Sequence, residues 1–447
     1  MIRKWILAGA GVLCFFLALG APGAVAWAAP PAQAAAPQEK VDYSPAEYND
    51  YIAATRETNP QQRIKALDDF VAKHPNVSIK LLIPAYRIYY TTYFNELKNY
   101  RKAIEYADKM LSYGDKVDTT SRLEAHYIRA VSFHSVYSEK DPTAKEMATR
   151  ERESALEGLR LLPQWQKPEG ASDEQFAQSK KQFLALFNYT AGFTAAALKD
   201  YKSAIESFKA TLAVNPNDAL TYYRMGLAYL QMSPPESMDG FWALARSISL
   251  KVQGEAQVRA YLRNQLLRYQ QPSCDKLIDP QMNELVMLAA GSGERPATYK
   301  IYSAADLQKA REETTNFIID LKAGGEKAKL VWLATCGLEF PEVVGKVIEV
   351  SQTDPVVLKL YNGTDQAEIE AAKTANMDVK LDGQSEAKRI QKDDPVRFSG
   401  TLVGYDPEPF MLHWEKAKVN PEDIPAEKTH PAKRAPAKRP AKKATKH

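Results

Sequence analysis

The side chains best suited to chemistry in this chain are its histidines and paired carboxylates, and their spacing favours no reaction. The sequence holds six histidines among 447 residues. His126 and His134 stand eight residues apart, on broadly one face of an expected helix, but no carboxylate accompanies them at a spacing that suits a metal ion. Acidic pairs such as Asp68-Asp69 are typical of solvated faces in a chain with 55 acidic residues. We therefore interpret these groups as structural and expect no metal and no cofactor.

Motifs of known catalytic machinery are missing from the sequence. It contains no H-E-x-x-H, no G-x-S-x-G, no C-x-x-C and no Gly-rich phosphate loop. The segment "AGGEKAK" at 323–329 has two glycines but no strand before it, so it predicts a helix stop and linker. We expect a non-enzymatic protein, and an enzyme of unknown type remains the third of three hypotheses.

The first residues indicate export. Arg3 and Lys4 precede the uncharged run "WILAGAGVLCFFLALGAPGAVAWA", in which 24–26 and 26–28 are A-x-A cleavage sites. This pattern predicts a secretory signal peptide over residues 1–28 and a secreted or periplasmic mature protein. The alternative is an uncleaved signal that anchors the chain in a membrane. Gly20, Pro22 and Gly23 interrupt the apolar helix and favour cleavage.

Two cysteines remain after signal removal. Cys274 and Cys336 fit no zinc motif, and in an oxidising compartment they could form one disulfide. Their spacing does not decide between a paired and a free state.

Both ends of the mature chain are biased in composition. Residues 29–42 are an Ala/Pro-rich linker, and residues 421–447 form a tail that we expect to be disordered. Residues 428–447 hold eight basic residues and no acid. Without these eight, Arg3 and Lys4, the chain has 49 basic against 55 acidic residues. A cationic tail on an acidic body predicts an electrostatic tether to an anionic surface or polymer; its charged residues include Lys433, Arg434, Lys438, Arg439, Lys442 and Lys443.

Apolar residues recur at three- and four-residue intervals over residues 43–269, which predicts helices. The segments "KNYRKAIEYADKML" (98–111) and "KDYKSAIESFKATLAVNPND" (199–218) share one pattern. Gly192 and Gly226 lie 34 residues apart at matching positions. Ala204, Phe208 and Pro216 complete the clearest copy, with small residues for close helix contact, Phe208 to fill the space between repeats and Pro216 to end a helix.

This pattern resembles the tetratricopeptide repeat, a 34-residue helix-turn-helix unit. The resemblance covers about half the chain and implies four to five imperfect repeats stacked as an α-solenoid. With the export signal and the C-terminal pattern described below, the chain resembles exported bacterial tetratricopeptide-repeat proteins. Such stacks bind peptides or extended protein segments in a concave groove. The resemblance therefore implies protein partners in the cell envelope.

The expected groove residues lie on the first helices of the repeats. Asn188 is the strongest candidate, because it is polar and lies in the most regular repeat. A packing role is the alternative for each aromatic candidate, since tyrosines often lie between helices. The other candidates are Tyr86, Tyr90, Tyr127, Tyr222, Tyr223 and Arg224.

The last third of the chain changes its period. Residues 270–329 predict a helical connector, in which Ser303 caps a helix. Over residues 330–420, short alternating segments such as "EVVGKVIEV" and "VRFSGTLVGY" predict about five strands. Their spacing resembles an oligonucleotide/oligosaccharide-binding (OB) barrel; an unrelated β-sandwich is the alternative. We therefore expect a mainly α chain with a small C-terminal β-barrel.

The barrel offers a second candidate surface. Tyr361 and Tyr405 could stack on a sugar or base and Lys359 could add a positive charge, although a role as a spacer or docking domain is the alternative. The leading hypothesis is an exported scaffold that binds protein partners. The second is a binder of an anionic glycan, lipid or nucleic acid through the barrel and tail.

Overall fold

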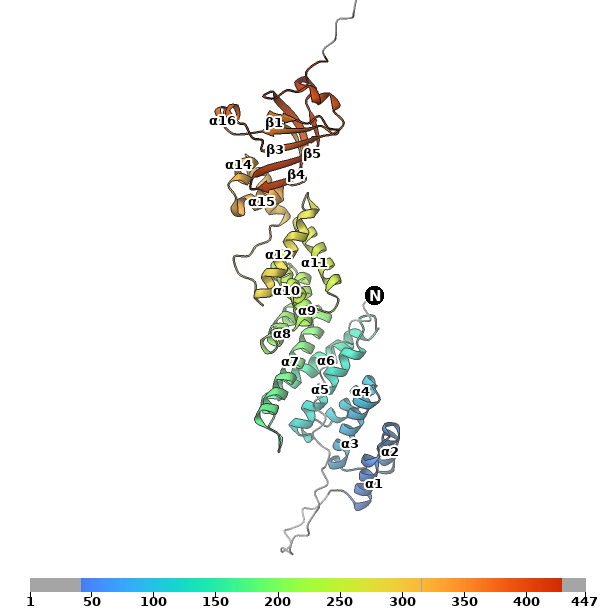
Figure 1. The fold of residues 1–447 in the computed structure, drawn as a ribbon. Coiled ribbons are helices and arrows are strands. Elements are labelled where there is room, and N and C mark those ends of the chain that lie inside the picture. Colours follow the sequence, from blue (N-terminus) through green and yellow to red (C-terminus); the bar gives the residue numbers. More distant parts are fainter. Residues whose placement is uncertain (1–41, 315, 428–447) are drawn as a thin grey trace, which may run out of the picture. The chain divides into compact units, whose positions relative to one another are not determined.

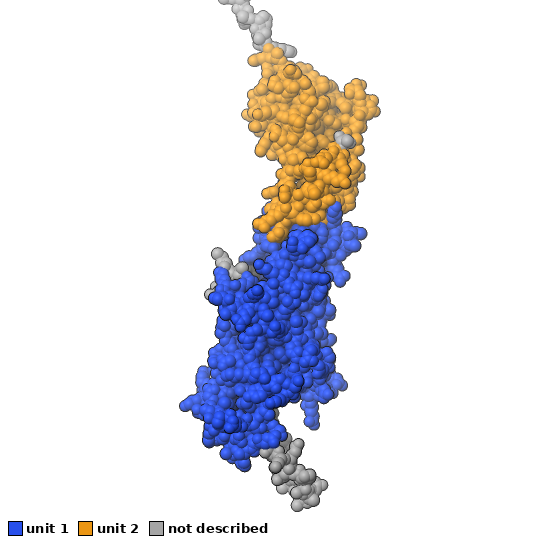
Figure 2. All heavy atoms as spheres, turned by 180° about the vertical axis from the view of Figure 1, so that it is seen from behind, with its two compact units in different colours: residues 1–264, 281–300 blue, residues 265–280, 301–447 orange. Residues whose placement is uncertain are grey.

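The computed structural model describes residues 42–314 and 316–427. The predicted signal peptide, nearly all of the linker and the basic residues of the predicted tail lie outside these residues. The chain divides into two compact units, coloured separately in Figure 2. Unit 1 comprises described residues 42–264 and 281–300, and unit 2 comprises residues 265–280 and 301–427 without residue 315. Within the described ranges, no helix has the length and apolarity needed to cross a membrane.

Unit 1 is a series of antiparallel helix pairs, as the sequence predicts (Figure 1). The pairs are α1/α2, α3/α4, α5/α6, α7/α8 and α9/α10. Helices α11 and α12 follow them, and the residues of α11 from 265 on belong to unit 2. Their bounds are α1 Pro45–Arg56, α2 Pro60–Lys73, α3 Ile79–Thr91, α4 Tyr100–Leu111, α5 Thr119–Val136, α6 Ala144–Leu161, α7 Asp173–Ala197, α8 Tyr201–Val214, α9 Ala219–Gln231, α10 Ser237–Ser249, α11 Glu255–Gln270 and α12 Ile278–Gly291.

Local sequence explains where these helices begin. Ser44 and Ser172 cap α1 and α7 in full capping boxes, in which the residue three positions later returns a hydrogen bond to the cap. Asp200 and Asp218 accept hydrogen bonds from the first turns of α8 and α9. Pro216 follows two residues after α8 ends, as predicted.

Glycines allow the close helix contacts that the repeat pattern requires. A Cβ placed on Gly192 of α7 would lie 2.8 Å from the Phe208 ring on α8. A Cβ on Gly226 of α9 would lie 2.8 Å from Leu244 on α10 and 3.0 Å from the Gly240 carbonyl oxygen. Gly192 and Gly226, which lie 34 residues apart, thus allow the same close helix contact in successive pairs. Phe208 packs inside its own pair and also joins the core that α8 shares with α9.

The helical connector predicted over residues 270–329 is divided between the two units. Residues 281–300, which include most of α12, belong to unit 1. Unit 2 receives the helices α13 (Ala304–Glu313), α14 (Phe317–Lys322) and α15 (Gly325–Thr335). Ser303 caps α13 as predicted, and Asn316 caps a separate helix, α14. Gly324 and Gly325 adopt positive φ between α14 and α15, so they form a turn rather than a linker.

Unit 2 contains the predicted small barrel. Five strands close in the order β1-β2-β3-β5-β4. Strand β3 runs parallel to β5, and the other neighbouring pairs are antiparallel. The bounds are β1 Glu339–Val350, β2 Val357–Tyr361, β3 Met377–Leu381, β4 Pro395–Pro407 and β5 Phe410–Val419. Residues 330–335, predicted to belong to the β domain, are instead the end of α15.

The alternating residues of the strands fill the barrel. Val396, Phe398 and Leu402 of β4 are buried on one side, as predicted, and Trp414 of β5 packs edge-on against Phe398. A Cβ on Gly400 would lie 3.1 Å from that of Ala417, so close strand contact requires the glycine. Ile318 and Leu321 of α14 join the same core and tie the helix to the barrel.

Cys274 and Cys336 form a disulfide within unit 2. Their Cα atoms are 5.5 Å apart, and the bridge spans 62 positions of sequence. Both cysteines are buried. The disulfide resolves the question that the sequence left open.

Candidate functional site

Two predicted groove residues are core residues instead. Tyr90 of α3 and Tyr222 of α9 are 1% and 5% exposed. The hydroxyl of Tyr222 lies so close to Gly293 that a Cβ there would meet it at 2.4 Å. These side chains are enclosed by their neighbours and cannot line an open surface, so their prediction as groove residues is wrong.

Tyr86 and Tyr127 are half-buried in aromatic packing. Tyr86 contacts the rings of Tyr106 and Tyr113, with centroids 6.3 and 6.2 Å away. Tyr127 of α5 stacks on Phe183 of α7 at 4.4 Å. Burial is the main cause that raises the pKa of each phenol to about 12. Both tyrosines thus pack between helices. This is the packing role that the sequence left open as the alternative.

Asn188 is half-buried on α7. Its Nδ2 donates a hydrogen bond of 2.9 Å to the carbonyl oxygen of Leu184, one turn earlier in the same helix. This bond leaves the amide oxygen and the second N–H of Asn188 as the groups that could meet a partner. Its role in binding stays a prediction.

The first helices of successive pairs contact one another. Helix α1 contacts α3, α3 contacts α5, α5 contacts α7 and α7 contacts α9, in addition to their pairing with the even-numbered helices. Helices that converge in series form the inner side of a curved stack. We call the surface formed by these odd-numbered helices the first-helix face.

Six side chains from three of these helices form one aromatic and basic cluster, which we call the Arg224 cluster. None is fully buried or fully exposed. The cluster consists of His134 of α5 and Tyr137 directly after it, Tyr189 and Phe193 of α7, and Tyr223 and Arg224 of α9. Two of the predicted residues, Tyr223 and Arg224, therefore lie together.

Phe193 is at the centre of the cluster. Its ring centroid is 5.1 Å from that of His134 and 5.4 Å from that of Tyr137. The guanidinium carbon of Arg224 lies 4.9 Å from the Phe193 centroid and 6.0 Å from that of Tyr223. These distances are typical of cation–π contacts. One ring of α7 thus joins α5 to α9.

The cluster holds one full positive charge. His134 Nε2 is hydrogen-bonded to Thr190 Oγ1 at 3.0 Å. Burial of the ring, and secondarily the charge of Arg224, lower the pKa of His134 to about 3. His134 is therefore neutral near pH 7, and Arg224 is the cation. Burial also raises the pKa of Tyr189, although the nearby Arg224 opposes this effect.

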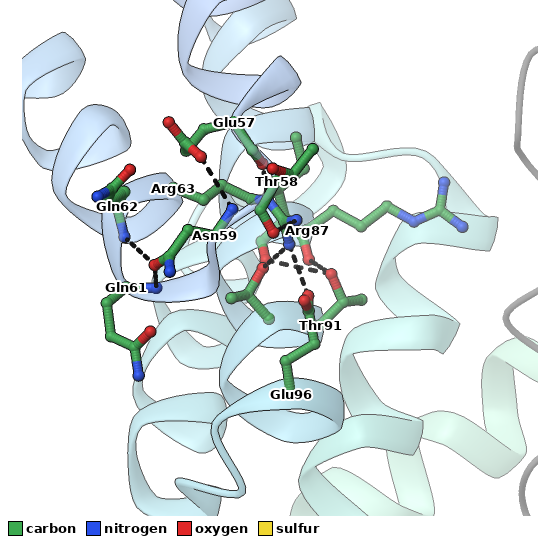
Figure 3. Close-up of polar contacts among 11 residues, drawn as sticks. Glu57, Thr58, Asn59, Gln61, Gln62, Arg63, Arg87, Thr91 and Glu96 are labelled. Atoms are coloured by element: carbon green, nitrogen blue, oxygen red, sulfur yellow. Dashed lines mark hydrogen bonds and ion pairs between the residues drawn. The ribbon is translucent and has the colours of Figure 1, made fainter.

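Arg63 is an example of an arginine whose side chain is bonded within the structure. Arg63 of α2 donates to the Glu57 carbonyl oxygen at 2.7 Å and to Glu96 Oε1 at 2.5 Å (Figure 3). It also donates to Thr58 and Thr92. Arg63 thus ties the α1–α2 loop to the turn after α3. By contrast, Arg224 makes no ion pair within residues 42–314 and 316–427, and its buried Nε has no hydrogen-bond partner.

Sequence reasoning missed four members of the cluster. Tyr189 stands 34 residues before Tyr223, so the repeat offset itself could have identified it. Phe193 lies one helical turn after Tyr189, on the same face. His134 and Tyr137 lie in a repeat without the glycine landmark, and the sequence offered no register for them.

The predicted barrel residues are spread over the surface of unit 2. Lys359 is exposed on β2, with Glu349 and Asp378 as its cross-strand neighbours. The hydroxyl of Tyr361 donates to Glu368 Oε1, and that of Tyr405 donates to the Leu321 carbonyl oxygen at 2.8 Å. Lys322 of α14 lies over the rings of Tyr361 and Phe410, at 5.7 and 5.5 Å. Acidic neighbours thus accompany Lys359 and Tyr361.

Among the described residues, no group of three or more His, Cys, Asp or Glu could hold a metal ion. His126 is buried and hydrogen-bonded to Ser154 at 2.8 Å. His134 belongs to the aromatic cluster. The two histidines thus pack within the helical unit.

Comparison with known proteins finds only a weak structural similarity. No family model matches the chain, and no curated protein matches it. A solved structure of MamA (residues 41 to the end) from Desulfovibrio magneticus RS-1 matches with a TM-score of 0.31 and 16% sequence identity. The match covers 47% of this chain and 94% of that one. The helix pairs of unit 1 themselves form a helical repeat.

Proposed function

We propose that this chain is an exported, non-enzymatic scaffold of the cell envelope that binds an extended segment of a protein partner on the first-helix face. The stack of helix pairs with matched glycines supports a tetratricopeptide-type solenoid. The sequence of residues 1–28 supports export. Partner binding by such a stack needs no catalytic group, in keeping with the lack of catalytic motifs in the sequence.

One observation carries the proposal. Three successive first helices contribute rings and one guanidinium to the Arg224 cluster, and all of these side chains keep part of their surface open. Aromatic and arginine side chains dominate the binding energy of protein interfaces. Packing between helices already restrains these side chains. Binding of a partner would therefore cost little additional conformational entropy at these residues.

Affinity purification from crosslinked envelopes tests the proposal. The bait is the full chain, compared with a Phe193→Ala/Tyr223→Ala variant. The matched control is Leu156→Ala on α6, where the side chain is 48% exposed on a second helix. We expect the double variant to lose specific partners that the control retains. Equal recovery from all three baits would contradict the proposal.

A second candidate function rests on the barrel. The closed order β1-β2-β3-β5-β4 with β3 parallel to β5 supports an OB-type barrel, a fold whose members bind oligonucleotides and oligosaccharides. The rings of Tyr361 and Phe410 could stack on a sugar or base, and Lys322, which lies over both rings, could supply a positive charge. We propose that this surface, together with the basic residues predicted in the tail, would bind an anionic polymer.

Heparin retention separates the two functions. A polymer-binding chain should elute earlier after deletion of 428–447 or after Lys322→Ala. Its affinity should also fall steeply between about 50 and 200 mM salt, because neutralised anionic groups release counterions. Affinity that does not change with salt would exclude the second candidate.

A further inference from the structure

We propose that α10 carries a second binding surface for an extended protein segment, and that residues 291–300 of the same chain keep this surface closed. We call these residues the strap. The segment that the surface fits presents an arginine and, four residues later, an aromatic side chain. The inference goes beyond binding at the first-helix face, because α10 is a second helix of unit 1 and the strap belongs to the same unit.

Three side chains of α10 hold the strap and the end of α12 that precedes it. Asp239, Trp242 and Arg246 are spaced three and four residues apart, so they lie on one face of the helix. Arg246 Nη1 donates to two carbonyl oxygens near the end of α12, at 3.1 and 2.7 Å. Trp242 Nε1 donates to the carbonyl oxygen of Ser292 at 3.3 Å. One face of α10 thus binds main-chain carbonyl groups of a segment from elsewhere in the chain.

The side chains of the strap complement the same face of α10. Arg295 Nε donates to Asp239 Oδ1 at 2.9 Å, and the ring of Tyr299 lies edge-on to Trp242 with centroids 5.4 Å apart. Trp242 is only 3% exposed with the strap in place. Tryptophan, tyrosine and arginine are the side chains that contribute most to binding at protein interfaces. The strap therefore occupies α10 as a bound peptide would.

Contacts of side chains hold the strap on the helices. None of residues 291–300 is buried, and no backbone hydrogen bond joins residues 291–299 to α9 or α10 in the described chain. Release of the strap would therefore break no helix, but it would uncover Trp242. The uncovered indole ring and its N–H would favour another segment that supplies a ring and a carbonyl oxygen.

Gly293 determines how closely the strap approaches α9. A Cβ on this residue would lie 2.4 Å from the hydroxyl oxygen of Tyr222. The ring of Tyr222 also contacts Arg246, whose guanidinium carbon is 5.8 Å from the ring centroid. A larger side chain at position 293 would therefore push the strap away from the helices and leave all three side chains of α10 in place.

A fluorescent peptide with the sequence of residues 289–300 tests the inference, and fluorescence anisotropy measures its binding to the full chain. A Gly293→Val/Arg295→Ala chain has a loosened strap and is compared with the unmodified chain. A third chain adds Asp239→Arg to the loosened strap, which reverses the charge on α10. The matched control is Gly291→Val, because a Cβ at that position would meet no atom within 4 Å and would leave the strap in place.

We expect the loosened chain to bind the peptide. The unmodified chain and Gly291→Val should bind it at least about tenfold more weakly, because a closed strap lowers the apparent affinity in proportion to the fraction of open molecules. The added Asp239→Arg should abolish binding. A peptide with Arg295→Glu should bind this third chain, because the two charges of the ion pair are then exchanged. Arg295→Ala alone is a milder way to loosen the strap and should give the same ranking.

Three outcomes would overturn the inference. The first is a lack of peptide binding by a loosened chain that keeps its helices, as judged by circular dichroism. The second is equal binding by the loosened and unmodified chains, which would mean that the strap does not close the surface. The third is binding that persists after Asp239→Arg, which would mean that the peptide binds away from α10. None of these outcomes depends on partner binding at the first-helix face.

Discussion

The ring of Phe208 occupies the space that a side chain on Gly192 would need. A Cβ on Gly192 would lie 2.8 Å from that ring and 3.2 Å from the Ala204 carbonyl oxygen, and Phe208 is fully buried. The contact joins α7 to α8 in the pair that contributes Tyr189 and Phe193 to the Arg224 cluster. The spacing of this helix pair therefore helps to position the candidate site.

The variant Gly192→Ala should destabilise unit 1. Overpacking typically costs about 1–3 kcal/mol, which exceeds the gain of about 1 kcal/mol from replacing a helical glycine by alanine. Urea unfolding followed by circular dichroism measures the difference. Gly291→Ala on α12 is the control, because a Cβ there would meet no atom within 4 Å. A Gly192→Ala chain as stable as the control would show that the ring of Phe208 can move aside.

The sequence was most informative where packing is local. Helix periodicity, the 34-residue glycine offset and the strand alternation near Phe398 and Trp414 predicted the helix pairs and the barrel. Small side chains at a fixed spacing indicate a close contact between helices that are also neighbours in sequence. The same local signal could not predict that Tyr222 is covered by the segment around Gly293, because that contact joins residues about 70 positions apart.

Only two of the six residues of the candidate site were predictable, for the same reason. Tyr223 and Arg224 were chosen for their place on a first helix, and they lie in the cluster. Whether a tyrosine on such a helix is open or enclosed depends on the neighbouring helix, as Tyr90 shows. The sequence around His134 shows only a histidine without metal ligands, because its place beside Phe193 depends on the contact between α5 and α7.

Glu151 on α6 should make unit 1 less stable as pH rises. The carboxylate pairs with Arg129 at 3.3 Å, but burial outweighs this pairing and raises its pKa from 4.5 to about 7. The folded state therefore holds a proton that the unfolded state releases, and stability falls between pH 4.5 and 7. This contribution is on the order of 3 kcal/mol by the usual conversion.

The variant Glu151→Gln should remove this dependence of stability on pH, because glutamine does not titrate. Arg129 keeps its contact with Asp108 in this variant. Unfolding free energies measured from pH 5 to 8 provide the check. If the difference between variant and parent does not change with pH, Glu151 is ionised in the folded state throughout this range.

His126 should act in the opposite direction. Burial is the main cause that lowers its pKa from 6.5 to about 4. Between these values the unfolded chain binds a proton that the folded chain does not, so stability falls as pH decreases from 6.5 to 4. We expect His126→Gln to flatten the loss in acid. NMR titration of the imidazole should place its midpoint near pH 4, whereas a midpoint near 6.5 would contradict the burial argument.

The disulfide should stabilise unit 2. Removing a bridge that closes a loop of this length typically costs about 2–4 kcal/mol. A Cys274→Ser/Cys336→Ser chain should therefore unfold its barrel at lower temperature, while the transition of unit 1 changes less. Alkylation before and after reduction, read by mass spectrometry, should show both thiols blocked in the mature protein. Full labelling without reductant would mean that the two cysteines are free.

Partner binding at the Arg224 cluster is the central claim, and photocrosslinking in the cell tests it most directly. A photoreactive phenylalanine analogue replaces Tyr223 on the first-helix face or, in the control, Leu156 on the second helix α6. We predict a discrete protein adduct from position 223, and none from position 156, after illumination of intact cells. An adduct from position 156 with none from position 223 would contradict the claim.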